Sequence, residues 1–338
     1  MSGAENPAWW VYHGHGLPPA GEPPAWPEPP AWRTFDGGPA LAPPAADDAE
    51  FVRRLGAPSA ASAAEAAPDE IMRVNAALHL RRPLLVTGKP GTGKSTLAYK
   101  IARELGLGPV LRWPISSRTV SQDGLWEYDA IGRVQAAATQ AGPDIGGFLR
   151  LGPLGTALLP YDRPRVLLID ELDKSDIDLP NDLLSVFEDG DYEIQPLTRI
   201  AATQPEVTVF THDRGGRAVV REGHVRCRAF PVVIVTSNGE REFPPAFLRR
   251  CLRLRMPPPN LDQLVGMVAA HFRDRPVPLR AQDLIREFLG TSERSGGLAN
   301  DQLLNALHLA TSGAYERDPS WELLRDALWE RLSTGGSD

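Results

Sequence analysis

Short apolar runs alternate with amphipathic stretches through the middle of the chain. Patterns typical of buried strands occur at 82–88 (RPLLVTG), 109–115, 165–170 (RVLLID), 230–238 (FPVVIVTSN) and 251–256. Helical periodicity fills the intervals at 63–80, 94–106 and 179–190. Because continuous apolar strands joined by helical crossovers pair in parallel, the pattern predicts an open α/β sheet with helices on both faces.

The pattern changes at the proline run 257–260 (PPPN), which is a strong breaker. Amphipathic helical stretches follow at 261–272, 281–289, 299–310 and 320–332. We therefore expect an N-terminal arm at 1–60, an αβα domain at 61–258 and a small helical lid domain at 259–334.

Two segments enlarge the α/β part. Residues 116–160 contain a stretch with helical character at 124–140, followed by a glycine-rich stretch. Residues 191–230 contain alternating apolar positions on both sides of DRGG, which predicts a β-hairpin.

The arm is rich in proline, which disfavours regular helix and sheet. It also carries four tryptophans, Trp9, Trp10, Trp26 and Trp32. Two interpretations remain open: a flexible leader, or an arm that docks its tryptophans on this chain or on a neighbour. His13 and His15 have no further ligand cluster nearby in the sequence, so we do not expect a metal site there.

Composition narrows the class of protein. The 338 residues are 42% hydrophobic and 23% charged, with a net charge of -7, which is ordinary for a globular protein and unlike a general nucleic-acid coat. Two cysteines are too few for a disulfide framework, and no segment has the length of a membrane span. With no recognisable secretion signal, a cytoplasmic location is the expectation.

A phosphate-binding pattern lies between the first strand and its helix. The segment GKPGTGKS (88–95) fits G-x-x-x-x-G-K-[ST], in which backbone amides hold phosphates, the lysine (Lys94) reaches the outer phosphates and the hydroxyl (Ser95) ligates Mg²⁺. The expected nucleotide-binding residues are Gly88, Pro90, Gly91, Thr92, Gly93, Lys94, Ser95 and Thr96. ATP and Mg²⁺ are therefore the expected substrate and cofactor.

Acidic residues follow the third strand. Asp170 at its end suits the Mg²⁺ shell, and Glu171 is placed to activate an attacking water, which indicates hydrolysis. The segment DKSD (173–176) superficially resembles a guanine-reading element, but we interpret it as helix capping. The base preference is then undetermined, with adenine as the first expectation. Asn238 ends another buried strand, where it serves either as a turn former or as a contact to the γ-phosphate and the attacking water.

Together these motifs resemble the AAA+ ATPases, most closely the MoxR-like group, over roughly residues 65–334. The resemblance implies that Asn238 is the sensor 1 residue and that Arg294, in GTSERSGG, is the sensor 2 arginine. It also implies an arginine finger in LRRC that acts on a neighbouring subunit. The family pattern has an acidic residue before this arginine, whereas this chain has two arginines; Arg250 aligns with the family's arginine, and Arg249 is the alternative.

The resemblance implies an ATP-hydrolysing homo-oligomer, expected to be a hexameric ring, that remodels or activates a protein partner. A protein with a von Willebrand factor A-type domain is the implied partner. One alternative is a nucleic-acid-directed motor or a defence-complex NTPase, because the second insertion carries Arg217, Arg226 and Arg228. A small-molecule P-loop kinase is a further alternative.

Overall fold

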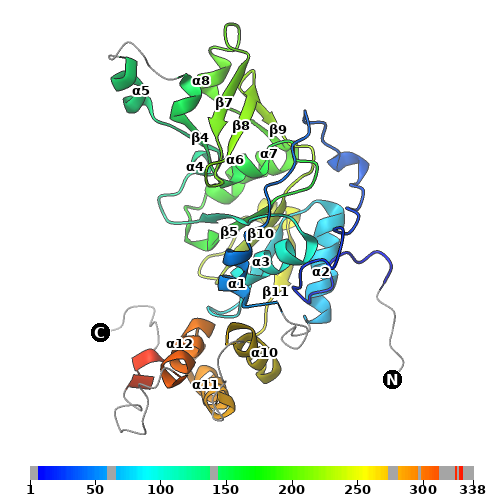
Figure 1. The fold of residues 1–338 in the computed structure, drawn as a ribbon, viewed down its shortest axis with the longest axis vertical. Helices are drawn as coiled ribbons and strands as arrows, with labels where there is room; N and C mark the ends of the chain where they lie inside the picture. The colour runs from blue at the N-terminus through cyan, green and yellow to red at the C-terminus, as the bar shows by residue number, and fades with distance from the viewer. Residues whose placement is uncertain are drawn as a thin grey trace.

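The fold comes from a computed structural model of the whole chain. It describes residues 7–58, 66–137, 144–272, 281–295, 298–311, 324–325 and 327–329. Figure 1 shows a parallel sheet in the middle of the molecule, a second sheet at one end and lid helices at the other.

The central sheet has five parallel strands in the order β11-β1-β10-β5-β2. Its strands are β1 Leu84–Thr87, β2 Leu111–Pro114, β5 Val166–Asp170, β10 Val232–Ser237 and β11 Leu252–Arg255. Every residue of β5 and β10 is buried, as expected for strands that are covered on both faces. The predicted α/β class is confirmed.

Helices cover both faces of this sheet. On one face lie α1 Asp48–Leu55, α2 Pro68–Leu80 and α3 Lys94–Leu105, which share a core with inward residues of the strands. On the other face lie α6 Pro153–Ala157, α7 Leu179–Asp189 and α9 Pro245–Arg250. Proline occupies the first turn of four of these helices, α2, α6, α7 and α9, where its missing N–H costs no helical hydrogen bond.

The two insertions join in one second sheet of six strands, in the order β3-β4-β7-β8-β9-β6. These strands are β3 Trp126–Tyr128, β4 Leu149–Leu151, β6 Asp191–Glu193, β7 Glu206–Phe210, β8 Arg217–Arg221 and β9 His224–Arg226. The antiparallel pairing of β7 with β8 confirms the predicted hairpin. Other short elements are α4 Ser121–Leu125 before β3, α5 Ala130–Ala137 and η3 Ile145–Phe148 between β3 and β4, η4 Leu172–Lys174 after β5, and α8 Gln195–Thr198 between β6 and β7.

The prediction of one helix over 124–140 is wrong. The segment contains the end of α4, then β3, then α5. Trp126, Glu127 and Tyr128 pair with Leu151, Arg150 and Leu149, so a partner from outside the segment overrides the local helical pattern.

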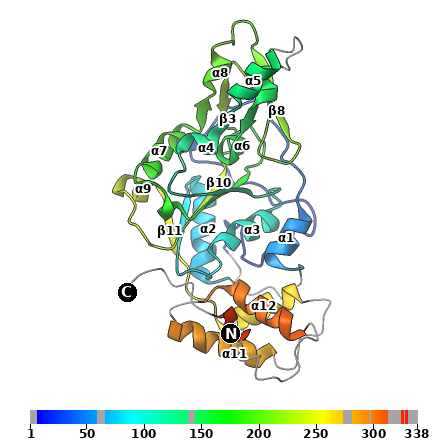
Figure 2. The same cartoon turned by 90° about the vertical axis from the view of Figure 1, so that its left-hand side faces the viewer.

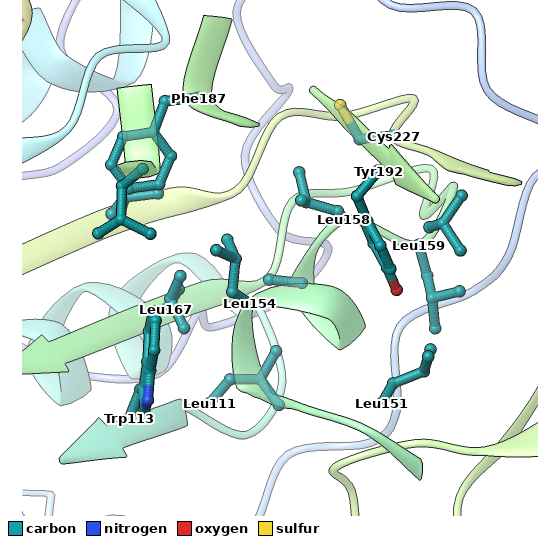
Figure 3. Packing of buried hydrophobic residues seen from close by; sticks show 14 of the residues in the cluster. Leu111, Trp113, Leu151, Leu154, Leu158, Leu159, Leu167, Phe187, Tyr192 and Cys227 are labelled. Carbon is teal, nitrogen blue, oxygen red and sulfur yellow. The ribbon is translucent and has the colours of Figure 1, made fainter. Parts of the chain in front are cut away.

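One buried cluster fills the space between the two sheets. Figure 3 shows Leu111 of β2 and Leu167 of β5 in the same core as Leu151 of β4 and Tyr192 of β6. Tyr192 also donates a hydrogen bond from its hydroxyl to the carbonyl of Gly155, at 3.1 Å. The second sheet is therefore packed on the central domain rather than tethered to it.

The lid helices are α10 Leu261–His271, α11 Ala281–Ser295 and α12 Asn300–Thr311. They enclose a separate apolar cluster that includes Leu264, Phe288 and Leu303, and Figure 2 shows them below the central sheet. The helix predicted at 320–332 falls largely outside the described residues. The boundaries at residues 60 and 258 stay predictions. None of the helices in the described part of the chain has the length and hydropathy needed to cross a membrane.

The arm docks on the chain's own core, although tryptophan is not its main anchor. Tyr12 is fully buried against α2 and α3, whereas Trp32 is 81% exposed. The Asn75 amide accepts hydrogen bonds from the Val11 and Tyr12 backbone N–H groups and donates one to the Tyr12 carbonyl. The carboxylate of Glu104 accepts from the next backbone amides, those of His13, Gly14 and Gly16.

The arm also contains regular structure that its composition did not predict. A short 3₁₀ turn, η1, spans Ala31–Arg33, and helix α1 packs on α3 and on lid helix α10. Just after α1, the Ala57 N–H donates a hydrogen bond to the carbonyl of Ala270 at 2.9 Å. The arm therefore contacts both the central domain and the lid.

Candidate active site

Three neighbouring strands, β1, β10 and β5, deliver the predicted site residues to one edge of the central sheet. The pairing Thr87↔Ser237 places the start of the glycine-rich loop beside the end of β10, and Val235↔Ile169 aligns β10 with β5. Since the strands are parallel, their carboxyl ends meet at this edge, where α/β proteins bind ligands.

The loop after β1 has the backbone of a phosphate cradle. Gly91 and Gly93 have φ of 78° and 84°, a region that favours glycine, and Gly93 is the residue before α3. The free N–H groups at the start of α3 and the helix dipole favour an anion here.

Lys94 is folded back into this loop. Its Nζ donates hydrogen bonds to the carbonyls of Gly88 and Lys89, both at 2.8 Å, and the residue is 7% exposed. Burial lowers the pKa of the ammonium from its ordinary value, and the carboxylates of Asp173, Glu171 and Asp170 oppose that effect. The lysine is thus held beside three acidic groups, and none of the carboxylates in the described segments is bonded to it directly.

Asp170 is bonded on both carboxylate oxygens. Ser95 Oγ donates to Oδ1 at 2.6 Å and Thr236 Oγ1 donates to the same oxygen at 2.9 Å. Arg112 of β2 donates to Oδ2 from Nε and Nη2, at 3.1 and 2.7 Å. Burial alone would raise the pKa of this carboxyl, but these hydrogen bonds outweigh burial, and the pKa lies below its ordinary value.

Glu171 sits on a strained backbone. Its φ of 63° and ψ of 49° are left-handed, which costs a non-glycine residue on the order of 1–3 kcal/mol. The conformation is held by a hydrogen bond from its N–H to Thr236 Oγ1 at 2.8 Å. Its carboxylate accepts hydrogen bonds from Lys174 Nζ at 2.7 Å and from Asn238 Nδ2 at 3.5 Å, and the bond that Lys174 donates to Glu171 raises the pKa of Lys174.

The interpretation of DKSD as helix capping is wrong. Asp173 lies in the 3₁₀ turn η4, and its Oδ2 accepts hydrogen bonds from the backbone N–H groups of Asn238, at 2.8 Å, and Glu240, at 3.1 Å. Asp178, the residue before α7, makes no side-chain capping bond. Asp173 instead fixes the loop that carries Asn238.

Two cavities flank the glycine-rich loop. The larger, of about 630 Å³, is lined by Gly88, Lys89 and Asn238 together with the segment after β11. The smaller, of about 240 Å³, lies between the loop and the lid residues Phe288 and Leu289. The lid approaches the loop so closely that a Cβ added at Gly91 would lie 2.5 Å from the Ala299 Cα. A ligand on the loop would therefore also meet the lid.

The sequence profile of the AAA domain (dynein-related subfamily) matches residues 83–251, which is half of the chain. The chain belongs to this family. The matched region runs from just before β1 to just after α9, and so contains the glycine-rich loop and every polar strand end described above.

Comparisons beyond the family profile are more distant. A search among curated proteins returns no match. Solved structures that match in part include NtrX from Brucella abortus in complex with ADP, at 13% identity and a TM-score of 0.38, and in complex with ATP, at 12% and 0.37. In both comparisons 80% of this chain aligns with 56% of the NtrX chain, so this chain spans little more than half their length.

The two adjacent arginines of this AAA domain have different surroundings. Arg250 at the end of α9 donates a hydrogen bond and forms an ion pair with Glu188 of α7, which raises the pKa of Arg250 and lowers that of Glu188. Arg249 is exposed, and its side chain makes no hydrogen bond or ion pair within the described part of the chain. Arg294 lies on α11, and its side chain falls outside the described residues.

The donor set at the end of β5 suits a magnesium ion. Ser95 and Asp170 bring a hydroxyl and a carboxylate to within 2.6 Å of each other, and Mg²⁺ prefers oxygen ligands of this kind. Sequence reasoning missed Arg112 and Thr236, and it assigned the wrong role to Asp173 and Lys174, which also shape this site. The VTSN run could have indicated Thr236, whereas Arg112 gave no signal, since an arginine at an exposed position of a strand is ordinary.

Proposed function

We propose that this chain is the subunit of an ATP-hydrolysing AAA+ ring of the MoxR-like type that remodels or activates a protein partner. One observation carries the proposal of hydrolysis. The strand-end pair Asp170–Glu171 contacts Ser95 on one side and Asn238 on the other. A phosphate loop, a metal-type carboxylate and a second carboxylate suited to water activation thus converge at one edge.

Each residue then has a defined role toward ATP. The backbone amides from Gly91 to Thr96 hold the phosphates, and Lys94 turns from the loop carbonyls to the outer phosphates. Ser95 and Asp170 hold Mg²⁺, which neutralises phosphate charge when bound. Breaking two hydrogen bonds of 2.8 Å to reorient Lys94 is compensated because ionic bonds to phosphate are stronger than bonds to carbonyls.

Glu171 accepts the proton of the attacking water, and Asn238 orients that water and the γ-phosphate. For this to occur, Glu171 must exchange its bond with Lys174 for one to the water. Both side chains are more than 40% exposed, so this ion pair contributes little to stability and opens at small cost.

Assembly would complete the site. In the proposed ring, the α9 arginines of one subunit reach the γ-phosphate bound by the next, where an arginine supplied in trans stabilises the transition state. Arg250 aligns with the family's finger, but Glu188 engages it within the chain, which leaves Arg249 available for the neighbour. Arg294 would contact the nucleotide from the lid as sensor 2.

A protein is a better candidate partner than a nucleic acid. Two arginines of the second sheet are neutralised, because Arg221 pairs with Glu206 at 2.9 Å and Arg226 pairs with Asp36 at 2.9 Å. A track for a phosphate backbone needs uncompensated positive charge. A protein with a von Willebrand factor A-type domain remains the partner implied by the MoxR resemblance.

The test is the ATPase rate per subunit as a function of protein concentration, measured together with assembly by mass photometry. We expect the rate per subunit to rise with concentration and to follow the appearance of ring-sized particles. The matched control is Lys94→Ala, which we expect to lose nucleotide binding.

A rate per subunit that does not depend on concentration, from a particle that stays monomeric, would overturn the ring. If rings form but do not hydrolyse ATP, the proposal that the protein is an ATPase is overturned. Stimulation by DNA or RNA that weakens with salt would favour the nucleic-acid motor over the protein remodeller.

A further inference from the structure

Arg112 occupies the carboxylate that the proposed function assigns to magnesium. Its guanidinium donates from Nε and Nη2 to a single oxygen, Asp170 Oδ2, while Ser95 and Thr236 share the other oxygen. The Asp170 carboxylate therefore accepts four hydrogen bonds, and its charge is already paired with the guanidinium of Arg112.

The position of Arg112 follows from the alternation of β2. Leu111 and Trp113 are buried in the core between the two sheets, so Arg112 points to the opposite face, where α3 lies. The register sets Pro114 beside Asp170 and Arg112 beside Leu168, and a long side chain is needed to reach forward along the strand. Arginine is the side chain with that reach and with donors for a carboxylate.

The contact is built to be exchangeable. Asp170 has only 9% of its side chain exposed, whereas the Arg112 side chain is 44% exposed. Among the described residues, the guanidinium of Arg112 donates hydrogen bonds to Asp170 alone. If Arg112 left Asp170, water would solvate the guanidinium and no other hydrogen bond of that group would be broken. The buried carboxylate would then need another cation as its partner.

A magnesium ion is such a replacement. A divalent cation on Asp170 and a guanidinium on the same carboxylate repel each other, so each weakens the other's hold. Building on the proposed function, we propose that Arg112 is a positioning residue that competes with Mg²⁺ for Asp170. Arg112 keeps the metal site neutralised when the metal is absent and leaves Asp170 when the metal–nucleotide complex binds.

The experiment measures metal binding rather than turnover. The full chain is saturated with ADP, and the dissociation constant of Mn²⁺, which replaces Mg²⁺ as a paramagnetic probe, is measured by electron paramagnetic resonance. Arg112→Gln removes the charge and keeps much of the volume. Because the Arg112 guanidinium competes with the metal for the same carboxylate, we expect Arg112→Gln to bind Mn²⁺ about 10-fold more tightly than wild type.

A thermal measurement provides the second readout. In EDTA, Arg112→Gln should melt at a lower temperature than wild type, because the buried Asp170 then has no counter-ion. Adding ADP and Mn²⁺ should close this gap, since a ligand that binds only the folded state stabilises it by mass action. A residue with a purely structural role would leave the gap unchanged.

Two further variants complete the design. Arg253→Gln, on β11 at the other edge of the sheet, removes an exposed strand arginine remote from Asp170 and should leave the Mn²⁺ affinity unchanged. Arg112→Lys keeps the charge and should bind Mn²⁺ more weakly than Arg112→Gln.

The outcomes separate this inference from the proposed function. If wild type binds ADP and Mn²⁺ and Arg112→Gln binds the metal equally or more weakly, the competition is overturned and the proposed function stands. If wild type in the presence of ADP binds no Mn²⁺, both are overturned.

Discussion

Arg250 donates a hydrogen bond to Glu188 of the same chain, whereas the neighbouring Arg249 has no such partner among the described residues. The Arg250–Glu188 ion pair joins the end of α9 to α7 at the surface of the central domain. The two consecutive arginines therefore differ in role. Arg250 links two helices of its own chain, whereas the side chain of Arg249 can contact another molecule.

We expect Arg249→Ala to lower the ATPase rate per subunit by about 10³-fold or more, since an arginine supplied in trans contributes on that scale. Stability should change by less than about 0.5 kcal/mol, as for other exposed substitutions. Arg250→Ala should reduce turnover less. The measurement is steady-state turnover at a concentration where rings form. A larger loss of turnover for Arg250→Ala than for Arg249→Ala would show that Arg250, the position that the family alignment favours, is the arginine finger.

Mixing experiments test whether the arginine acts between subunits. Arg249→Ala and Glu171→Gln subunits should each be inactive alone, and mixed rings should recover part of the turnover. In a mixed ring, a site with an intact Glu171 receives Arg249 from its neighbour. Mixed assembly without recovery would argue against action in trans.

Glu171→Gln should bind ATP with nearly wild-type affinity and hydrolyse it about 10²–10⁴-fold more slowly, because the amide cannot accept the proton of the attacking water. Binding is measured by titration of a fluorescent ATP analogue and hydrolysis by phosphate release. Lys94→Ala is the contrasting variant, with binding itself lost. Normal phosphate release from Glu171→Gln would show that the base is elsewhere.

Asn75→Ala should detach the first part of the arm. The side chain is fully buried, and its loss leaves backbone groups of Val11 and Tyr12 without partners, each at a cost of about 1–3 kcal/mol. Urea unfolding should show the lower stability, and limited proteolysis should cut before residue 20 in the variant first. Asn181→Ala, at an exposed position of α7, is the control and should behave like wild type.

Alkaline pH should weaken the fold through its two buried thiols. Burial raises the pKa of Cys227 and of Cys251 from 9.0 to about 12. Below pH 9 both states keep the protons, so this contribution to stability is complete; as pH rises towards 12 the unfolded state ionises first and stability falls. Unfolding in urea at about pH 8 and about pH 10.5 should show a smaller loss for the double variant Cys227→Ala/Cys251→Ala than for wild type.

The local pattern of apolar residues was sufficient to predict the fold of the central domain. The β5 and β10 runs are apolar at nearly every position because both faces of those strands are covered, and this property is visible without a partner. The glycine-rich loop was equally clear, because its sequence encodes both the turn and the chemistry. These features can be predicted because they depend only on residues that are close in sequence.

The missed features depend on partners far away in sequence. Strand β3 pairs with β4 more than twenty residues later, and β4 in turn pairs with β7 of the other insertion. Arg112 acquires its role only because the register of β2 and β5 brings it to Asp170. Asn75 and Glu104 anchor the arm from helices whose sequences give no sign of it.

The common core between the two sheets constrains how the proposed hydrolysis could produce motion. Since side chains such as Leu111 and Tyr192 belong to one close-packed cluster, the insertions cannot hinge against the central sheet without opening that cluster to water. The lid has its own core and so can rotate as an intact body, provided that the contact of α10 with α1 opens. In the proposed ring, force on a partner bound at the second sheet would then arise from displacement of whole subunits, with the two sheets of each subunit moving as a single rigid body.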